Sequence, residues 1–211
     1  MRPLQIALAG NANVGKSVLF NYLTGLHQHI GNWPGKTIEK AEGKLNFKGT
    51  EIKIIDLPGI YSLSTFSLEE LISRDYIARE KPDVVVNVVD ASVLERNLFF
   101  TLQLIELGRP VVIALNMVDL ARERGIEVKA EKLSKLLGVP VVPMVATKAI
   151  GVSDLMEAVI GASKKKQKRY LLSHKRPLEN QIQGLTKMVS RLGLDYRRGG
   201  QQSNCLRRMN A

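Results

Sequence analysis

Cysteine and long apolar runs are almost missing from this 211-residue sequence. Its single cysteine, Cys205, excludes an internal disulfide framework and is compatible with a reducing compartment. No uncharged apolar run approaches the roughly 18–20 residues that cross a bilayer. We expect no signal peptide, because Arg2 is followed at once by a short apolar run and a Gly-rich stretch. We therefore expect a soluble chain.

Acidic residues are scarce in the last quarter of the sequence. The net charge of +11 arises there: residues 1–162 hold 18 Lys plus Arg and 18 Asp plus Glu, whereas residues 163–211 hold 13 and 2. Apolar residues make up 45% of the chain, which is enough for a packed core. The uneven charge predicts one globular domain over residues 1–163 and a basic segment over residues 164–211.

The Gly-rich stretch at residues 10–17 fits the phosphate-binding pattern Gly-x-x-x-x-Gly-Lys-Ser/Thr. An apolar run precedes it and a helical pattern follows, so backbone N–H groups and a positive helix end would converge on a phosphate. Lys16 would reach the β- and γ-phosphates, and the Ser17 hydroxyl would bind Mg²⁺. We expect nucleotide contacts from Gly10, Asn11, Ala12, Asn13, Val14, Gly15, Lys16, Ser17 and Val18.

Apolar periodicity predicts alternating strands and helices along the rest of the domain. Strands are expected at residues 4–9, 42–47, 51–55, 84–89, 111–115 and 141–145. Helices are expected at residues 17–23, 67–80, 95–107, 130–137 and 153–164, with Ser67 and Ser153 as N-caps. Residues 25–40 read as a long loop. The pattern predicts an α/β fold: a mostly parallel sheet of six to seven strands, one antiparallel hairpin strand, and helices on both faces.

Polar residues follow several of these strands, at the sheet edge where parallel α/β folds bind ligands. Asp56 and Gly59 form Asp-x-x-Gly, in which the carboxylate can hold Mg²⁺ and the glycine N–H can meet a γ-phosphate. The same tetrapeptide, Asp-Leu-Pro-Gly, is also a good turn. Its spacing after the phosphate loop favours the functional interpretation.

A second pair of loops indicates which base is bound. Asn116-Met-Val-Asp119 resembles the guanine-recognition motif Asn-Lys-x-Asp, although a plain turn would also fit. Asp119 would accept from N1–H and the 2-amino group of guanine, whereas adenine would leave the carboxylate unpaired. Met117 replaces the common Lys, and its stem can cover the base. A backbone N–H for guanine O6 is expected from Val145, Ala146 and Thr147.

Four strings together resemble the cytosolic GTPase domain of the ferrous iron transport protein B family over about residues 3–165. They are residues 10–17, Gly31-Asn-Trp-Pro-Gly-Lys-Thr37, Asp56-Leu-Pro-Gly-Ile-Tyr-Ser-Leu and Arg74-Asp-Tyr, with Ala12 where the family usually has Pro. The resemblance implies a Ras-like P-loop GTPase that binds GTP and GDP with Mg²⁺. It implies that Thr37 closes on Mg²⁺ and the γ-phosphate, so that Ser17, Thr37 and Asp56 serve the metal.

The same resemblance implies a partner and a place in the cell. The domain would gate, or signal to, a membrane permease for Fe²⁺ that is absent from this chain. It would work at the cytoplasmic face of the cell membrane. Self-association of the domain stays open.

The hydrolytic machinery departs from that of many Ras-like GTPases, because Ile60 stands where they place the water-orienting Gln. No Arg finger is evident in the phosphate loop, although Arg74 remains a candidate. The resemblance implies that Asn13 is a K⁺ ligand, assisted by backbone carbonyls of Gly31 and Trp33; otherwise Asn13 only stabilises the turn. The catalytic residues expected are Asn13, Lys16, Thr37 and Gly59.

Three features remain open at this point. His27 and His29 fit exposed loop residues better than a metal site. Trp33 is either a cover over the ligand or a packed loop residue. Residues 164–211 predict a basic linker and the start of a helical regulatory segment, with anionic lipid headgroups as a candidate partner. The competing class, a soluble tRNA- or ribosome-associated GTPase with an RNA-binding tail, is less favoured because no RNA-binding fold follows.

Overall fold

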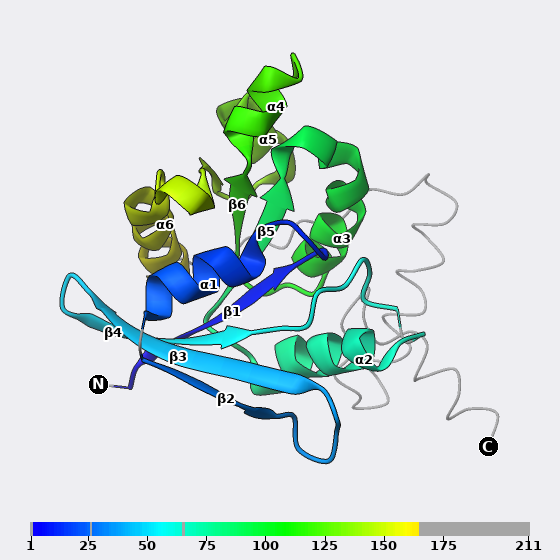
Figure 1. Ribbon diagram of the computed structural model, residues 1–211, viewed down its shortest axis with the longest axis vertical. Coiled ribbons are helices and arrows are strands. Elements are labelled where there is room, and N and C mark those ends of the chain that lie inside the picture. The colour runs from blue at the N-terminus through cyan, green and yellow to red at the C-terminus, as the bar shows by residue number, and fades with distance from the viewer. Residues whose placement is uncertain (1, 26, 65, 165–211) are drawn as a thin grey trace, which may run out of the picture.

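Seven strands form one sheet at the centre of the fold. The computed structural model describes residues 2–25, 27–64 and 66–164 (Figure 1). The expectations for residues 165–211 therefore lie outside the described residues. The strands lie in the order β2-β3-β4-β1-β5-β6-β7. Their bounds are β1 Leu4–Gly10, β2 Gln28–Asn32, β3 Glu39–Phe47, β4 Thr50–Asp56, β5 Val84–Asp90, β6 Val111–Asn116 and β7 Val141–Pro143.

One strand, β3, runs against the others. It pairs antiparallel with β2 and β4, whereas the remaining neighbours, from β4 through β1, β5 and β6 to β7, pair in parallel. The parallel strands β5 and β6 are nearly continuous apolar runs that are buried along their length. The predicted mostly parallel sheet with one antiparallel hairpin strand is confirmed.

Helices cover both faces of the sheet, as predicted (Figure 1). α1 and α6 pack on one face through a core that includes Leu19 and Leu155. α2, α3 and α5 pack on the other face through a core that includes Phe100 and Leu104. The helix bounds are α1 Lys16–Thr24, α2 Leu68–Asp75, α3 Leu94–Glu106, α4 Val118–Glu123, α5 Ala130–Leu137 and α6 Val152–Lys164.

Helix α2 begins as the capping pattern predicts. The Ser67 hydroxyl accepts a hydrogen bond from the Glu70 backbone N–H at 3.1 Å, which satisfies one free donor of the first turn. The helix continues into a π-helical turn, Tyr76–Glu80, so the expected extent of residues 67–80 is confirmed with a change of helix type at its end.

Two sequence-based expectations are wrong. Residues 25–40 contain strand β2, which the apolar pattern missed because its residues are mostly polar and exposed. Backbone pairing with β3 holds this strand at the sheet edge.

The second wrong expectation concerns the last helix. Ser153 does not cap it, because α6 begins one residue earlier, at Val152. The chain enters that helix through Gly151, whose φ of 82° lies in the left-handed region, and Leu155 N–H already donates to the Gly151 carbonyl at 3.0 Å.

A polar contact sits inside the core between β5 and α3. Asn87, 1% exposed in the middle of β5, donates from Nδ2 to the Thr101 hydroxyl at 2.8 Å. That hydroxyl in turn donates to the Asn97 carbonyl at 2.9 Å. Because a buried amide without a partner is costly, the Thr101 hydroxyl fixes how α3 sits on the sheet.

Candidate nucleotide site

The loop between β1 and α1 has the backbone shape of a phosphate-binding turn. Asn13 and Gly15 both take left-handed conformations, with φ of 65° and 85°. Gly10 must lack a side chain, because a Cβ there would lie 2.6 Å from the Val88 carbonyl oxygen. Ser17 and Val18 form the first turn of α1 and are exposed. The loop therefore presents backbone N–H groups at the N-terminal end of a helix.

Asn11 and Ala12 occupy the first half of this loop. Asn11 is 3% exposed, and neither polar atom of its side chain has a hydrogen-bond partner among the described residues. Ala12 is exposed and lies against Gly59, where an added Cβ would come within 3.4 Å of the Ala12 Cα.

The lysine of the phosphate loop pairs with the carboxylate that ends β4. Lys16 Nζ lies 2.5 Å from Asp56 Oδ1, and both side chains are largely buried. Burial raises the pKa of the Asp56 carboxyl, and the Lys16 ammonium opposes part of that rise. The pair brings a cation suited to phosphate and an anion suited to Mg²⁺ to the same point.

The segment after β4 runs beside the phosphate loop. Leu57 N–H donates to the Leu8 carbonyl at 3.0 Å, and Ile60 N–H donates to the Gly10 carbonyl at 3.2 Å. These bonds continue the pairing of β4 with β1 beyond the end of the sheet and place Gly59 against the phosphate loop. Ile60 is 3% exposed and packs in the core, so its side chain does not reach solvent.

Asn116 joins three loops at the other side of the site. Its buried side chain donates from Nδ2 to the Val14 carbonyl and accepts at Oδ1 from the Ala146 N–H, both at 2.9 Å. Gly15 must lack a side chain here, because a Cβ would collide with the Asn116 amide. Asn116 therefore fixes the phosphate loop relative to the loop that follows β7.

The two base-recognition loops meet at an exposed ion pair. Met117 takes a left-handed conformation, with φ of 59°, and is the N-cap residue that directly precedes α4. Asp119 accepts from the Leu120 N–H at Oδ1 and from Lys148 Nζ at Oδ2, both at 2.9 Å. The hydrogen bond from Lys148, then that from Leu120, holds the pKa of Asp119 below its usual value. The sequence patterns did not include Lys148, although it directly follows the Val-Ala-Thr segment.

That segment forms a closed loop. Val145 and Ile150 exchange backbone hydrogen bonds, from Val145 N–H to the Ile150 carbonyl at 3.1 Å and back at 3.2 Å. Between them, Ala146–Lys148 forms a 3-10 turn in which Ala146 is buried and Thr147 is exposed. The turn aims its first residue at Asn116 and its last at Asp119.

Thr37 and Gly31, which were expected to contribute metal ligands, do not lie beside the phosphate loop. Gly31 lies in β2, paired with Lys40, and Thr37 is exposed in the turn between β2 and β3. In Figure 1 this turn lies at the lower edge of the molecule, away from the phosphate loop that follows β1. The structure therefore holds this segment open.

Trp33 is a packed residue of that turn. It is 9% exposed, and its ring meets that of Tyr76 edge-on, with centroids 5.4 Å apart. Burial raises the pKa of Tyr76 to about 12, and its hydroxyl accepts a hydrogen bond from Gln5 at 2.8 Å. The Trp33 carbonyl accepts from the Lys36 N–H at 2.9 Å. Of the two interpretations left open by the sequence, the contacts support packing in the loop.

Two histidines that could suggest a separate metal site lie away from the candidate nucleotide site. His27 and His29 are exposed beside Glu42, whose carboxylate pairs with Lys40 and Lys53. Within residues 2–25, 27–64 and 66–164, no group of three or more His, Cys, Asp or Glu could hold a metal ion. At the candidate nucleotide site, a metal ion would need oxygen ligands from a hydroxyl group, the nucleotide and water in addition to a carboxylate.

Arg74, the candidate finger, is buried in α2. Its guanidinium lies 3.4 Å from Asp75 Oδ1, and its side chain is 9% exposed.

In the described part of the chain, no helix has the length and apolar character of a membrane span.

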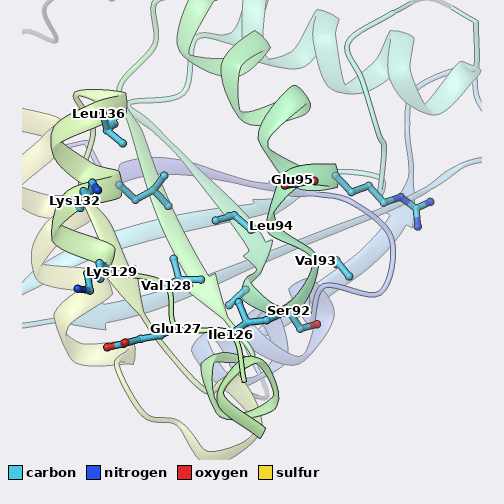
Figure 2. Close-up of a pocket in the computed structure, with 13 residues that line it drawn as sticks. Ser92, Val93, Leu94, Glu95, Ile126, Glu127, Val128, Lys129, Lys132 and Leu136 are labelled. Carbon is cyan, nitrogen blue, oxygen red and sulfur yellow. The ribbon is translucent and has the colours of Figure 1, made fainter. Parts of the chain in front are cut away.

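A separate groove of about 740 Å³ lies between the start of α3 and α5 (Figure 2). Figure 2 shows Leu94 on one side and Lys129, Lys132 and Leu136 on the other, with Ile126 below them. None of the phosphate-loop residues lines it. The groove is therefore distinct from the candidate nucleotide site.

Comparisons with known proteins agree on one family. A family model described as ferrous iron transport protein B matches residues 4–159. The Fe(2+) transporter FeoB of Escherichia coli K12 is 43% identical over 203 residues, which are 94% of this chain and 26% of that protein. The chain thus spans about a quarter of the length of the curated relatives that it matches.

Solved structures give the same result. The FeoB G-domain of Methanococcus jannaschii is 50% identical, with a TM-score of 0.69, over 78% of this chain and 100% of that one. A variant of S. thermophilus NFeoB bound to mGDP is 41% identical, with a TM-score of 0.81, over 89% and 72%. The chain therefore belongs to the ferrous iron transport protein B family and carries the fold of its G-domain.

Proposed function

We propose that this domain binds GTP and GDP together with Mg²⁺ and hydrolyses GTP to GDP and phosphate. The convergence of loops at one sheet edge carries the proposal: Lys16 meets Asp56 there, and Asn116 ties the phosphate loop to the loop after β7. The S. thermophilus relative, which binds mGDP, supports a guanine nucleotide as the ligand.

The metal would be held by Ser17 and Asp56, with Thr37 added in the triphosphate state. Ser17 is exposed at the start of α1, and Asp56 ends β4 beside Lys16, so a hydroxyl and a carboxylate are both available. Oxygen ligands of this kind suit Mg²⁺. When bound, Mg²⁺ would neutralise charge on the β- and γ-phosphates.

In hydrolysis, a water oxygen bonds to the γ-phosphorus while the bond to the β–γ bridging oxygen breaks and GDP leaves. Lys16 would stabilise charge on the phosphate oxygens, and the Gly59 N–H would hold the γ-phosphate. Ile60 is apolar and buried, so it cannot orient the water. Because no side chain at this position orients the water, GTP hydrolysis by the domain alone would be slow.

K⁺ bound by Asn13 would supply the positive charge that stabilises the phosphate oxygens during hydrolysis. This residue is exposed on the phosphate loop, where its backbone takes a left-handed conformation with φ of 65°. Carbonyl oxygens of Gly31 and Trp33 would complete the site, which requires the end of β2 and the turn between β2 and β3 to move. Bound K⁺ would supply positive charge where other GTPases use an arginine finger.

In the parent protein, the domain would regulate or power passage of Fe²⁺ through a membrane permease at the cytoplasmic face of the cell membrane. The relatives are named Fe(2+) transporters and are about four times as long as this chain. Residues 1–163 would form the G-domain, and residues 164–211 a basic linker and the start of a helical regulatory segment. Iron uptake by cells carrying the full-length protein with Lys16→Ala tests this role, and normal uptake would contradict it.

Base choice tests the biochemical core of the proposal. GTP and GDP should bind in the micromolar range or tighter, and ATP at least ~10³-fold more weakly, because a site built for donors rejects a base that lacks them. Fluorescence titration with labelled GDP and ADP, with and without Mg²⁺, measures this. Asp119→Asn should move the preference toward xanthosine nucleotides. Equal affinities for ATP and GTP in the unaltered protein would refute the guanine assignment.

A further inference from the structure

The ion pair between Asp119 and Lys148 links the two walls of the candidate base site. Asp119 stands in the first turn of α4, and Lys148 ends the 3-10 turn after β7. Their charged atoms lie 2.9 Å apart, with the side chains 35% and 62% exposed. The two residues are 29 positions apart in sequence, so the contact is specific to the fold.

The hydrogen bonds on Asp119 leave room for a base. A carboxylate has about four lone-pair positions, two on each oxygen. The Leu120 N–H takes one position on Oδ1, and the Lys148 ammonium takes one on Oδ2. These two bonds leave acceptor capacity on the carboxylate for the two adjacent donors of guanine, N1–H and the 2-amino group.

The cation beside Asp119 comes from outside the Asn-Met-Val-Asp motif. Met117 carries no charge where the pattern Asn-Lys-x-Asp has Lys. Lys148 approaches Asp119 from the 3-10 turn whose first residue, Ala146, donates its N–H to Asn116. The ammonium lowers the pKa of Asp119, and Asp119 raises the pKa of Lys148.

We propose that Lys148 is a positioning residue for base recognition. Its ammonium fixes the plane of the Asp119 carboxylate so that one acceptor on each oxygen faces guanine, and it joins the two loops that enclose the base. The inference rests on the proposed guanine-nucleotide function. An exposed ion pair alone contributes little, but a bound base removes water from it and strengthens the interaction. The effect should therefore appear in the bound state.

The direct test is Lys148→Met, which keeps most of the stem and removes the charge. Stopped-flow measurements with fluorescent GDP should show an affinity about three- to tenfold weaker, mostly through faster dissociation, because the loops are no longer joined. Lys148→Arg should retain the unaltered affinity. As a matched control, Lys48→Met removes another exposed ion pair, with Glu157 at 2.5 Å, and should leave GDP binding unchanged.

A double-mutant cycle separates positioning from a general effect of charge. With Asp119→Asn and xanthosine diphosphate as ligand, adding Lys148→Met should change affinity by less than about twofold, because the carboxylate partner is gone. GDP affinity unaffected by Lys148→Met, or equal losses in both backgrounds, would overturn the proposal. If the unaltered protein failed to bind GDP, the proposed function would fall and this inference with it.

Discussion

Lys16 Nζ and Asp56 Oδ1 lie 2.5 Å apart at the point where the phosphate loop meets the end of β4. Each residue is assigned to a different partner, Lys16 to phosphate and Asp56 to Mg²⁺. The ion pair keeps two largely buried charges compensated, since an unpaired one would be costly. Binding of nucleotide and metal therefore exchanges one set of charge contacts for another.

The raised pKa of Asp56 predicts a pH-dependent stability. Because burial lifts its folded-state pKa above the ordinary 3.8, the folded state holds the proton more tightly than the unfolded one. Its contribution to the free energy of unfolding is thus largest below pH 3.8 and is lost as pH rises through the raised pKa. Urea unfolding at several pH values, compared with Asp56→Asn, measures this difference.

The same shift affects metal binding. Mg²⁺ must compete with the proton on Asp56, so Mg²⁺-dependent nucleotide affinity should begin to fall at a pH above 3.8 when the solution is acidified.

The stability prediction has its own contradicting outcome. If the Asp56→Asn variant showed the same dependence of unfolding free energy on pH as the unaltered protein, the raised pKa would not belong to this carboxyl.

The polar contact between β5 and α3 predicts a loss of stability. Thr101→Val preserves shape but leaves the buried Asn87 amide without its acceptor, which should cost about 1–3 kcal/mol in the free energy of unfolding. Thr101→Ser keeps the hydroxyl and is the matched control. Chemical unfolding of both variants gives the difference, and equal stabilities would show that the hydroxyl is dispensable.

The sequence predicted the parts of the fold that depend on strong local patterns. β5 is a β-branched run interrupted only by Asn87, and Gly138 ends α5 in a left-handed conformation, so both elements matched. β2 has no such pattern: Gln28, His29 and Asn32 are polar, and pairing with β3 alone makes them a strand. α4 was not predicted because its six residues are too few to show a helical apolar period.

The candidate site divides in the same way. Motif spacing predicted that loops far apart in sequence would meet, and the contacts of Asn116 with Val14 and Ala146 show how they do so. Lys148 carried no motif of its own, and only the fold brings it to Asp119. The position of Thr37 depends on the conformation of its turn, which residue types alone do not determine.

Thr37 should matter only when the γ-phosphate is present. It is exposed in the turn between β2 and β3, so Thr37→Ala should fold normally and bind GDP with nearly unchanged affinity. GTP hydrolysis should slow, because the switch would lose its contact with Mg²⁺ and the γ-phosphate. Ser17→Asn is the comparison, since it should weaken binding of both nucleotides. Normal hydrolysis by Thr37→Ala would remove Thr37 from the metal site.

The last prediction concerns how the domain neutralises charge without a glutamine or a clear arginine finger. Ile60 is apolar and 3% exposed, and Arg74 is buried beside Asp75, so neither side chain is exposed to a ligand. GTP hydrolysis should therefore be slow in sodium buffer. Potassium should accelerate it about ten- to a hundredfold, equivalent to roughly 1–3 kcal/mol of transition-state stabilisation.

Asn13→Ala should abolish this acceleration and leave GDP affinity nearly unchanged, because the side chain is exposed and the phosphate contacts come from the backbone. The measurement is single-turnover hydrolysis in KCl and NaCl at matched ionic strength. Na⁺ is too small for a cage of carbonyl oxygens sized for K⁺, so Rb⁺ and NH₄⁺ should substitute better. Equal rates of the unaltered protein in both salts would exclude K⁺ and direct attention to Arg74 or a partner protein. Equal stimulation of both proteins would keep K⁺ but assign it to ligands other than Asn13.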